Sequence, residues 1–445
     1  MGPGSAAQPA VDFKIDLSSS NSGREGPDDS AAEEQRRRRN AAHICRTIGT
    51  NSLKGMGLLY SVGKVLKRKY RKAAGQTMKI PEEHSLSREY AVSSPFARWY
   101  EVYDEAPVQL QEPRNFGDLD ANFERWMDDI FPPLGVVELP DGYSVGLKGW
   151  VVTNDEILLS DQSWYGRHVG EMKLSQCFPI RSNLGLRLDP SVPVDQLDGT
   201  CLSLASDWST LNYAHFLLDG LCRLELFRKA GFELSDVDHV FVPSPNPAWS
   251  RFLDILGISD KVVEPQKRRA FQADTLIAPT FPGTRCVYPR FVVDFLRREF
   301  LSEPGGQDRR LYIPRTTTRQ PANEDTLITI LKEFGFEVFE PVEHENPPRV
   351  FSEAEIVVGA HGAGLADIAF CQPGTKILEL IPSDHVRPYW YTLSEAADLE
   401  YSYLVGPSTK ERPIPNDAWP RPSPYDFAVD EEDFRRAISI LLGAN

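Results

Sequence analysis

Cysteine is scarce in this 445-residue chain, and its six cysteines lie far apart, with no Cys-x-x-C pair among them. Such scatter argues against a structural zinc site and against a disulfide framework. We therefore expect reduced thiols and a cytoplasmic protein. No convincing cluster of metal ligands stands out elsewhere in the sequence, so we expect no bound cofactor and no requirement for a divalent metal.

Long apolar runs are also missing. No stretch reaches the roughly 18 uncharged apolar residues that a membrane span needs. The N-terminus lacks a basic segment followed by an apolar one, which is the pattern of a secretory leader. The sequence thus predicts neither a membrane span nor secretion.

Positive charge is confined largely to one segment of a chain whose net charge is −15. Residues 1–35 contain two basic and seven acidic residues and are rich in Ser and Gly, which is typical of a disordered tail. Residues 36–79 contain thirteen basic residues and no acidic ones. The acidic remainder argues against general nucleic-acid binding, because phosphate contacts need a basic surface.

Apolar residues interleave with the positive charges in the segment that we define as 36–81. A basic amphipathic segment of this kind attaches peripherally to an anionic membrane surface, here the inner face, or remains a solvated tail. Both interpretations stay open.

An alternation of short strands and helices begins after Asp198 and indicates an α/β fold with parallel, doubly wound sheets. The expected strands cover 200–205, 239–243, 274–278, 310–314, 337–341, 355–359, 376–381 and 400–405. The expected helices cover 212–229, 247–256, 289–300, 324–334, 363–370 and 385–397. Residues 82–198 are rich in Pro, Gly and Trp and indicate irregular β structure.

The alternation falls into two runs, separated near residues 302–309, and this predicts two Rossmann-like halves that face a cleft. Ligands of such sheets bind beyond the carboxyl ends of the strands. The resulting domains are 82–302, with the irregular β part first, and 303–410, which would bind the nucleotide. An extension at 411–445 would end in a helix over Asp430–Leu442.

A glycine-rich turn at 356–365, Ile-Val-Val-Gly-Ala-His-Gly-Ala-Gly-Leu, joins an expected strand to an expected helix. Glycines allow close approach of a ligand to the backbone, and free N–H groups at a helix start attract phosphate. The alternative is a tight turn that needs small residues, with His361 a core histidine rather than a phosphate donor. The residues that would surround a phosphate are Gly359, His361, Gly362, Ala363 and Gly364.

Charged residues lie near the carboxyl ends of two expected strands. Arg315 and Arg319 follow the strand at 310–314, where guanidinium groups would hold phosphate oxygens or simply face solvent. Glu379 interrupts an apolar strand near its carboxyl end, where it would accept hydrogen bonds from ribose or pair with an arginine. Asn323 precedes the helix at 324–334 and is interpreted as a structural cap.

His215 and Asp219 are four residues apart, which places both on one face of a helix. The helix dipole keeps a histidine in the first turns neutral, and a neutral histidine beside a carboxylate is a candidate general base. The alternative is a core histidine bonded to a surface aspartate. Asn212, which precedes them, is expected to be structural.

Four blocks in this order resemble glycosyltransferase family 61. They are Asn-x-x-His-x-x-x-Asp at Asn212, His215 and Asp219; Tyr-Ile-x-Arg at 312–315; Gly-x-His-Gly-Ala-Gly-Leu at 359–365; and Pro-Gly-Thr-x-x-x-Glu at 373–379. The first block reads Tyr-Ala-His-Phe where Tyr-Tyr-His-Trp is common in the family, and Asp367 stands where Asn is usual.

The resemblance implies a GT-B fold and a transfer that inverts the anomeric carbon. The donor would be a nucleotide-sugar, a UDP-sugar first of all, and the acceptor a glycan or lipid-linked glycan of a capsule or other surface polysaccharide. His215 would be the base and Asp219 its orienting partner, or the reverse. Arg315, Arg319 and the glycine-rich turn would hold the diphosphate, and Glu379 the ribose.

Two other classes remain open. An NAD(P)- or nucleotide-dependent enzyme would use Gly359–Gly364 for phosphate, with Glu379 or Asp384 on the ribose. A catalytically inactive scaffold of a glycan-synthesis complex would need none of the site residues.

Overall fold

The computed structural model describes residues 77–79, 81, 83–127, 130–162, 191–243, 247–267, 269–284, 286–303, 305–410 and 424–443. The chain divides into two compact units, Met1–Ala74 and Gly75–Asn445. The first unit lies outside the described residues, and with it the expected tail at 1–35 and most of the basic segment at 36–81. Among the described residues, no helix combines the length and the hydrophobicity that a bilayer crossing demands.

The first sheet of the second unit has a parallel part of four strands, in the order β13-β12-β11-β14. They are β11 (Ser191–Ser203), β12 (His239–Phe241), β13 (Val262–Val263) and β14 (Ala270–Pro279). Chain order along this sheet runs 3-2-1-4, so the winding direction reverses between β11 and β14. Such a reversal opens a crevice beyond the carboxyl ends of the two strands.

An antiparallel extension continues the sheet from β14. It contains β7 (Leu134–Pro140), β8 (Tyr143–Val145), β9 (Trp150–Val152), β10 (Ile157–Leu159) and β3 (Arg98–Tyr103). The strand β2 (Glu83–Ser85) pairs with β10 in parallel, and β1 (Thr77–Lys79) pairs antiparallel with β11. A two-stranded sheet pairs β4 (Ala106–Pro107) with β6 (Ile130–Phe131). The helices before the parallel strands are α3 (Ser87–Ser93), η1 (Phe123–Trp126) and η2 (Ser160–Gln162). The expected irregular β region is therefore largely one antiparallel wing.

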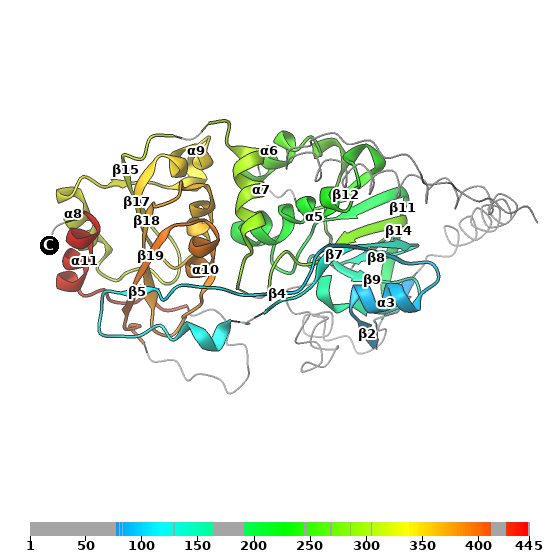
Figure 1. The fold of residues 1–445 in the computed structure, drawn as a ribbon, viewed down its shortest axis with the longest axis horizontal. Coiled ribbons are helices and arrows are strands. Elements are labelled where there is room, and N and C mark those ends of the chain that lie inside the picture. The colour runs from blue at the N-terminus through cyan, green and yellow to red at the C-terminus, as the bar shows by residue number, and fades with distance from the viewer. Residues whose placement is uncertain are drawn as a thin grey trace, which may run out of the picture. The chain divides into compact units, whose positions relative to one another are not determined.

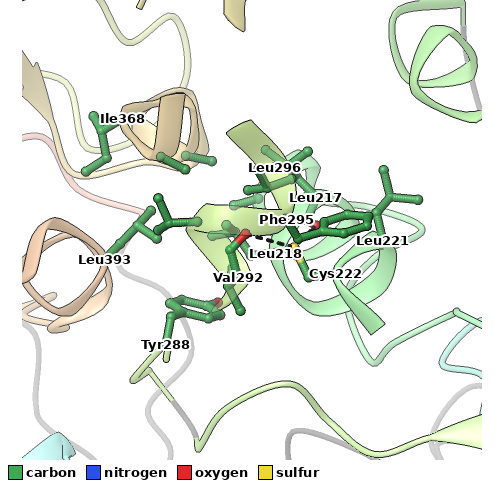
Figure 2. Close-up of a cluster of buried hydrophobic side chains, with 14 of the residues drawn as sticks. Leu217, Leu218, Leu221, Cys222, Tyr288, Val292, Phe295, Leu296, Ile368 and Leu393 are labelled. Atoms are coloured by element: carbon green, nitrogen blue, oxygen red, sulfur yellow. Dashed lines mark hydrogen bonds between the residues drawn. The ribbon is translucent and has the colours of Figure 1, made fainter. Parts of the chain in front are cut away.

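The connections of the parallel strands are helical. They contain the π-helix η4 (His215–Leu221), α5 (Arg223–Lys229), η5 (Leu234–Asp236), α6 (Pro247–Ile255), η6 (Ser259–Lys261) and α7 (Arg290–Phe300). Figure 2 shows how η4 packs against α7: Leu217 and Leu218 of η4, and Cys222 directly after it, contact Val292 and Leu296. This packing explains why a helix with an unusual hydrogen-bond pattern is stable here: its apolar face is completely buried.

The second sheet has the order β16-β15-β17-β18-β19-β5, and all its pairings are parallel. Its strands are β15 (Arg309–Ile313), β16 (Glu337–Val338), β17 (Ala354–Ala360), β18 (Lys376–Pro382) and β19 (Glu400–Gly406), with β5 (Arg114–Asn115) at the edge. Chain order over the first five is 2-1-3-4-5, so this sheet reverses between β15 and β17.

Helices cover both faces of the second sheet (Figure 1). Val357 and Ile377 pack in the cluster that includes residues of α9 (Pro347–Ser352), η8 (Ala363–Phe370) and α10 (Tyr389–Ala396). The alternate residues Val358 and Leu378 pack with residues of α8 (Glu324–Glu333) and α11 (Glu431–Leu441). Strand residues alternate between the faces, so nearly continuous apolar strands are what a doubly covered sheet requires.

The edge strand β5 comes from far earlier in the chain than its neighbours. Beside it, Phe116 donates its backbone N–H to Tyr403 O at 3.0 Å, and its side chain joins the α8–α11 cluster. The Tyr403 hydroxyl donates to Asp120 at 2.9 Å, and Tyr391 donates to Gln111 O. A segment N-terminal to the first parallel sheet thus completes the second.

The mixed α/β class with parallel sheets is confirmed, and so are most expected elements. The helix expected over 385–397 starts only at Tyr389. Pro388 disfavours a helical backbone at the residue before it, so the helix does not extend toward residue 385. The segment 363–370 is a 3₁₀ helix, and the strand expected over 337–341 ends at Val338. The closing helix over 430–442 is confirmed as Glu431–Leu441. An additional 3₁₀ turn, η7, covers Pro341–Glu343.

Candidate active site

The π-helix η4 presents a histidine–carboxylate pair at the reversal point of the first sheet. The Nδ1 atom of His215 lies 2.5 Å from Oδ2 of Asp219. Asp219 is 1 % exposed, and its other oxygen accepts a hydrogen bond from the Tyr288 hydroxyl at 2.8 Å. The imidazole is thereby oriented through Nδ1, which leaves Nε2 as the ring nitrogen not engaged by Asp219, on a side chain that is 14 % exposed.

The local sequence explains how this pair is placed. Asn212 Oδ1 accepts hydrogen bonds from the backbone N–H of Ala214 at 2.9 Å and of His215 at 3.4 Å, which caps the helix start. The residues that follow form the π-helix η4, and π-helices occur mostly as short segments and often at functional sites. Asn212 therefore has a structural place next to the pair.

Two aromatic side chains that the sequence did not single out flank His215. The ring of Tyr389 meets the imidazole edge to face, with centroids 5.9 Å apart. The indole of Trp208 lies 6.4 Å from it at a tilt of 37°. Burial, followed by interactions with Cys286 and then Asp219, raises the pKa of Tyr389, so its hydroxyl stays protonated. Tyr389 begins α10 and joins this first site to the second sheet.

The reversal point of the second sheet carries the arginines and the glycine-rich turn. Ile313 of β15 pairs with Gly359 of β17, so the two strand ends lie side by side. Arg315 and Arg319 follow the first strand, and the turn 361–364 follows the second. The arrangement brings together the groups that the sequence assigned to a diphosphate, at the edge where such sheets bind ligands.

Glycine is required in this turn for space. A Cβ on Gly362 would lie 1.7 Å from Nη1 of Arg315, although the backbone there is extended, with φ 177°. A Cβ on Gly359 would meet Leu365 Cδ2 at 2.8 Å. Arg319 adopts a left-handed backbone with φ 64°, which is uncommon for a residue with a side chain. The guanidinium of Arg315 thus lies directly on the turn.

The remaining turn residues are close to the same elements. Ala363 begins η8 and packs against the main hydrophobic cluster, while a Cβ on Gly364 would touch Ile313 Cγ2 at 3.1 Å. Asn323 lies apart from this site. Its side chain donates to Val429 O at 2.8 Å and accepts from Val429 N at 3.2 Å, which ties the start of α8 to the C-terminal segment.

The carboxyl group of Glu379 bonds a histidine and a tyrosine, whereas the sequence-based interpretations assigned it to ribose or to an arginine. It is 0 % exposed, its Oε1 lies 2.5 Å from Nδ1 of His361, and its Oε2 accepts from the Tyr401 hydroxyl at 2.5 Å. Both oxygens are therefore occupied by protein groups. The geometry makes Glu379 the residue that orients His361.

Burial sets the protonation of this pair. It raises the pKa of Glu379 to about 8 and, helped by the charges of Arg319 and Arg315, lowers the pKa of His361 well below its ordinary value. Both groups are thus favoured in their uncharged forms. In that state the Glu379 carboxyl donates to Nδ1, and His361 carries its proton on Nε2, where it is a donor for another group.

Three arginines gather around His361. Arg315, Arg319 and Arg387 all act electrostatically on its imidazole. Burial, followed by repulsion from Arg315, lowers the pKa of Arg319 to about 10, so all three remain charged at neutral pH. Arg387 is 7 % exposed and was not singled out in the sequence, because Val386-Arg387-Pro388 carries no motif. Such a half-buried cationic cluster is suited to an anion.

A buried carboxyl links the two sites. Asp367 on η8 is 0 % exposed and accepts a hydrogen bond from the Tyr213 hydroxyl at 2.7 Å through Oδ1. Its Oδ2 has no hydrogen-bond partner among the described residues. Burial raises the pKa of Asp367 to about 7. The bond connects the residue two positions before His215 with the helix that follows the glycine-rich turn.

The described part of the chain holds no group of three or more His, Cys, Asp or Glu side chains arranged for a metal ion. The candidate site is instead built from arginines, imidazoles and backbone N–H groups. These can stabilise an anion, and His215 can accept a proton.

Comparison with known proteins matches residues 213–378 to the family model described as Glycosyltransferase 61. Beta-1,2-xylosyltransferase RCN11 of Oryza sativa subsp. japonica is 41 % identical over 64 residues, 14 % of this chain and 12 % of the relative. A beta-1,2-xylosyltransferase of Arabidopsis thaliana is 32 % identical over 65 residues, 15 % of this chain and 12 % of the relative. The matched family region contains the His215–Asp219 pair, both motif arginines and the glycine-rich turn.

Proposed function

Because residues 213–378 belong to glycosyltransferase family 61, we propose that this protein transfers a sugar from a nucleotide-sugar donor to a hydroxyl group of a glycan. One observation carries the proposal. The proposal is supported by a candidate base near the reversal point of one parallel sheet together with a cationic cluster near the reversal point of another. Tyr389 contacts His215 and is electrostatically coupled to Arg387, which connects the two positions.

The donor diphosphate binds the cationic cluster. Arg315, Arg319 and Arg387 neutralise its charge, and Nε2–H of His361 donates a hydrogen bond to a phosphate oxygen. Charge builds up on the diphosphate as it departs, so preorganised cations and donors in a half-buried site lower the barrier. Glu379 orients His361 and does not bind the ribose, which is contacted by other groups.

The acceptor hydroxyl is activated by His215. Its Nε2 takes the hydroxyl proton while the acceptor oxygen attacks the anomeric carbon, and the bond from that carbon to the diphosphate oxygen breaks. Asp219 stabilises the imidazolium that forms, and Tyr288 holds Asp219 in place. Because attack and departure occur on opposite faces in one step, the anomeric configuration inverts.

A GT-B arrangement is part of the proposal, with the sheet around β11 on the acceptor side and the sheet around β17 on the donor side. The relatives' names make UDP-xylose the first donor to test, with other UDP-sugars next. We further propose a glycan or lipid-linked acceptor of a surface polysaccharide such as a capsule. The reaction would take place in the cytoplasm, with residues 36–79 at the inner face of the membrane and without a divalent metal.

The dinucleotide alternative loses support from Glu379. A dinucleotide site needs a carboxylate at the end of the next strand that is free to bind ribose hydroxyls. Glu379 is bonded to His361 and Tyr401 instead. Asp384 accepts a hydrogen bond from the Ser408 hydroxyl at 2.5 Å.

Titration calorimetry with UDP, UDP-xylose, UDP-N-acetylglucosamine, GDP-mannose and NAD tests the donor site. Uridine nucleotides should bind the wild type, and Arg315→Ala should bind them more weakly by about 10-fold or more, the loss of one charge-assisted contact. Gly306→Ala is the control, because a Cβ there would lie 3.8 Å from its nearest neighbour, Asp308 Oδ1. Binding of NAD alone, or of no nucleotide, would overturn the proposal.

A further inference from the structure

Trp208 is exposed immediately beside the candidate base. It lies in the turn that leaves β11, and 37 % of its surface is exposed. A single exposed aromatic residue needs no explanation by itself. This one lies 6.4 Å from the His215 ring, at the reversal point between β11 and β14 where ligands of such sheets bind.

The indole is held in place by a neighbouring network. The Lys148 ammonium lies 4.8 Å from the centre of the Trp208 ring and 5.2 Å from that of Trp150. Trp150 Nε1 donates to Asp207 Oδ1 at 2.7 Å, and Lys148 Nζ lies 3.8 Å from the same oxygen. Asp207 is buried and directly precedes Trp208. The Lys148 ammonium thus covers the Trp208 ring on one face, and its ion pair with the buried Asp207 holds it there.

We propose that Trp208 is the platform of the acceptor subsite, on which the apolar C–H face of a neutral pyranose ring stacks. The inference rests on the proposed transfer reaction and adds the chemical class of the acceptor unit. The indole and the imidazole have ring centres 6.4 Å apart, so a sugar stacked on this indole lies beside His215, and a hydroxyl on its rim is the group that Nε2 deprotonates. Asp207 neutralises Lys148, which favours an uncharged sugar over a uronic acid.

A flat, rigid aromatic surface suits this role because it adds contact area with little loss of conformational entropy. Sugars present polar hydroxyls around their rim and C–H groups on their faces. An aliphatic side chain would provide less area, and a charged one would be desolvated at a cost. The Trp208 platform therefore discriminates between acceptors by the shape of the sugar ring, while His215 determines which hydroxyl is deprotonated.

Saturation-transfer NMR tests the platform with methyl glycosides of xylose, mannose, glucose and galactose as probes. The wild type should transfer saturation to the ring C–H protons of at least one glycoside. Trp208→Ala should bind that glycoside about 10-fold more weakly, equivalent to about 1.4 kcal/mol, while Trp208→Phe retains most of the signal. Phe96→Ala is the control, because Phe96 is an exposed aromatic residue, at 66 %, outside the site.

Binding of UDP to the same variants separates the two proposals. Unchanged UDP affinity with lost glycoside binding in Trp208→Ala supports the platform. Glycoside binding that survives in Trp208→Ala, or none by the wild type to any of the four probes, overturns it whatever the nucleotide result. Glycoside binding without UDP binding would support the sugar site at Trp208 and contradict the proposed transferase activity.

Discussion

Replacement of Gly362 by alanine isolates the role of the Arg315 guanidinium. The new Cβ would lie 1.7 Å from Nη1, and ordinary van der Waals contact begins at 3.4 Å, so Nη1 must retreat by about 1.7 Å. A hydrogen bond to phosphate tolerates only a few tenths of an ångström around roughly 2.9 Å. The substitution therefore removes the contact of Arg315 with a bound diphosphate without removing the arginine.

The expected loss is that of one charge-assisted hydrogen bond, about 1.5–3 kcal/mol, which weakens UDP binding by about 10- to 150-fold. Stability should change little. The extended backbone at Gly362 accepts alanine, which gains about 0.4–1 kcal/mol from the unfolded state. The bond from Arg315 Nε to Thr318 O, worth about 0.5–1.5 kcal/mol, is lost in exchange.

Calorimetry with UDP and thermal unfolding measure the two quantities on the same samples. Gly306→Ala should match the wild type in both. The double variant Gly362→Ala, Arg315→Ala should bind UDP no more weakly than Arg315→Ala alone, since both changes remove the same contact. Wild-type UDP affinity in Gly362→Ala would refute the assignment of Arg315 to the diphosphate.

Three further outcomes are expected. Asp219→Asn should lower turnover by about 10²–10⁴-fold, the range of general base catalysis, while the UDP dissociation constant is unchanged; an equal loss in both would argue against a base at His215. The raised pKa of Glu379 means that its folded form keeps a proton that the unfolded chain releases, so its contribution to stability is complete below pH 4.5 and is lost as the pH rises to about 8. UDP affinity should fall over the upper end of that range, because an ionised Glu379 accepts a hydrogen bond from Nδ1, so the single proton of neutral His361 moves from Nε2 to Nδ1 and Nε2 no longer donates. Glu379→Gln should flatten both pH profiles, and profiles of this variant that match those of the wild type would contradict the pairing. Asp367→Asn should raise the unfolding free energy at pH 7 by about 1–3 kcal/mol, because an uncharged amide replaces a buried, half-satisfied carboxyl, and a chemical denaturation curve that shifts the other way would refute this.

The sequence predicts the parallel sheets well because their strands are apolar on both faces. Segments such as 376–381 leave little choice but a buried strand, and the alternation places Arg315 and Gly362 each just after a strand. Only the structure shows that these two strands are neighbours. The His215–Asp219 pair followed from helical spacing, which the π-helix keeps on one side. These features depend on residues that are close in the sequence, so their spacing alone predicts them.

Features that depend on tertiary contacts were not predictable. Glu379 lies on β18, and His361 directly follows the neighbouring strand β17; the depth that makes both oxygens of Glu379 inaccessible is a property of the packed sheet. Tyr389 reaches His215 from a distant helix, and Arg387 carries no motif. The region 82–198 gave no period, because its described strands before β11 are only two to seven residues long.

The edge strand β5 has a consequence for the expression of the second sheet as a separate fragment. A fragment of residues 303–445 would contain five strands and their helices, yet it would lack the Arg114–Asn115 pairing with β19 and the Phe116 ring that fills the α8–α11 cluster. Its β19 edge would be open to pairing with another copy. The fragment is therefore expected to aggregate when expressed alone, and a synthetic peptide spanning residues 110–123 should restore its solubility.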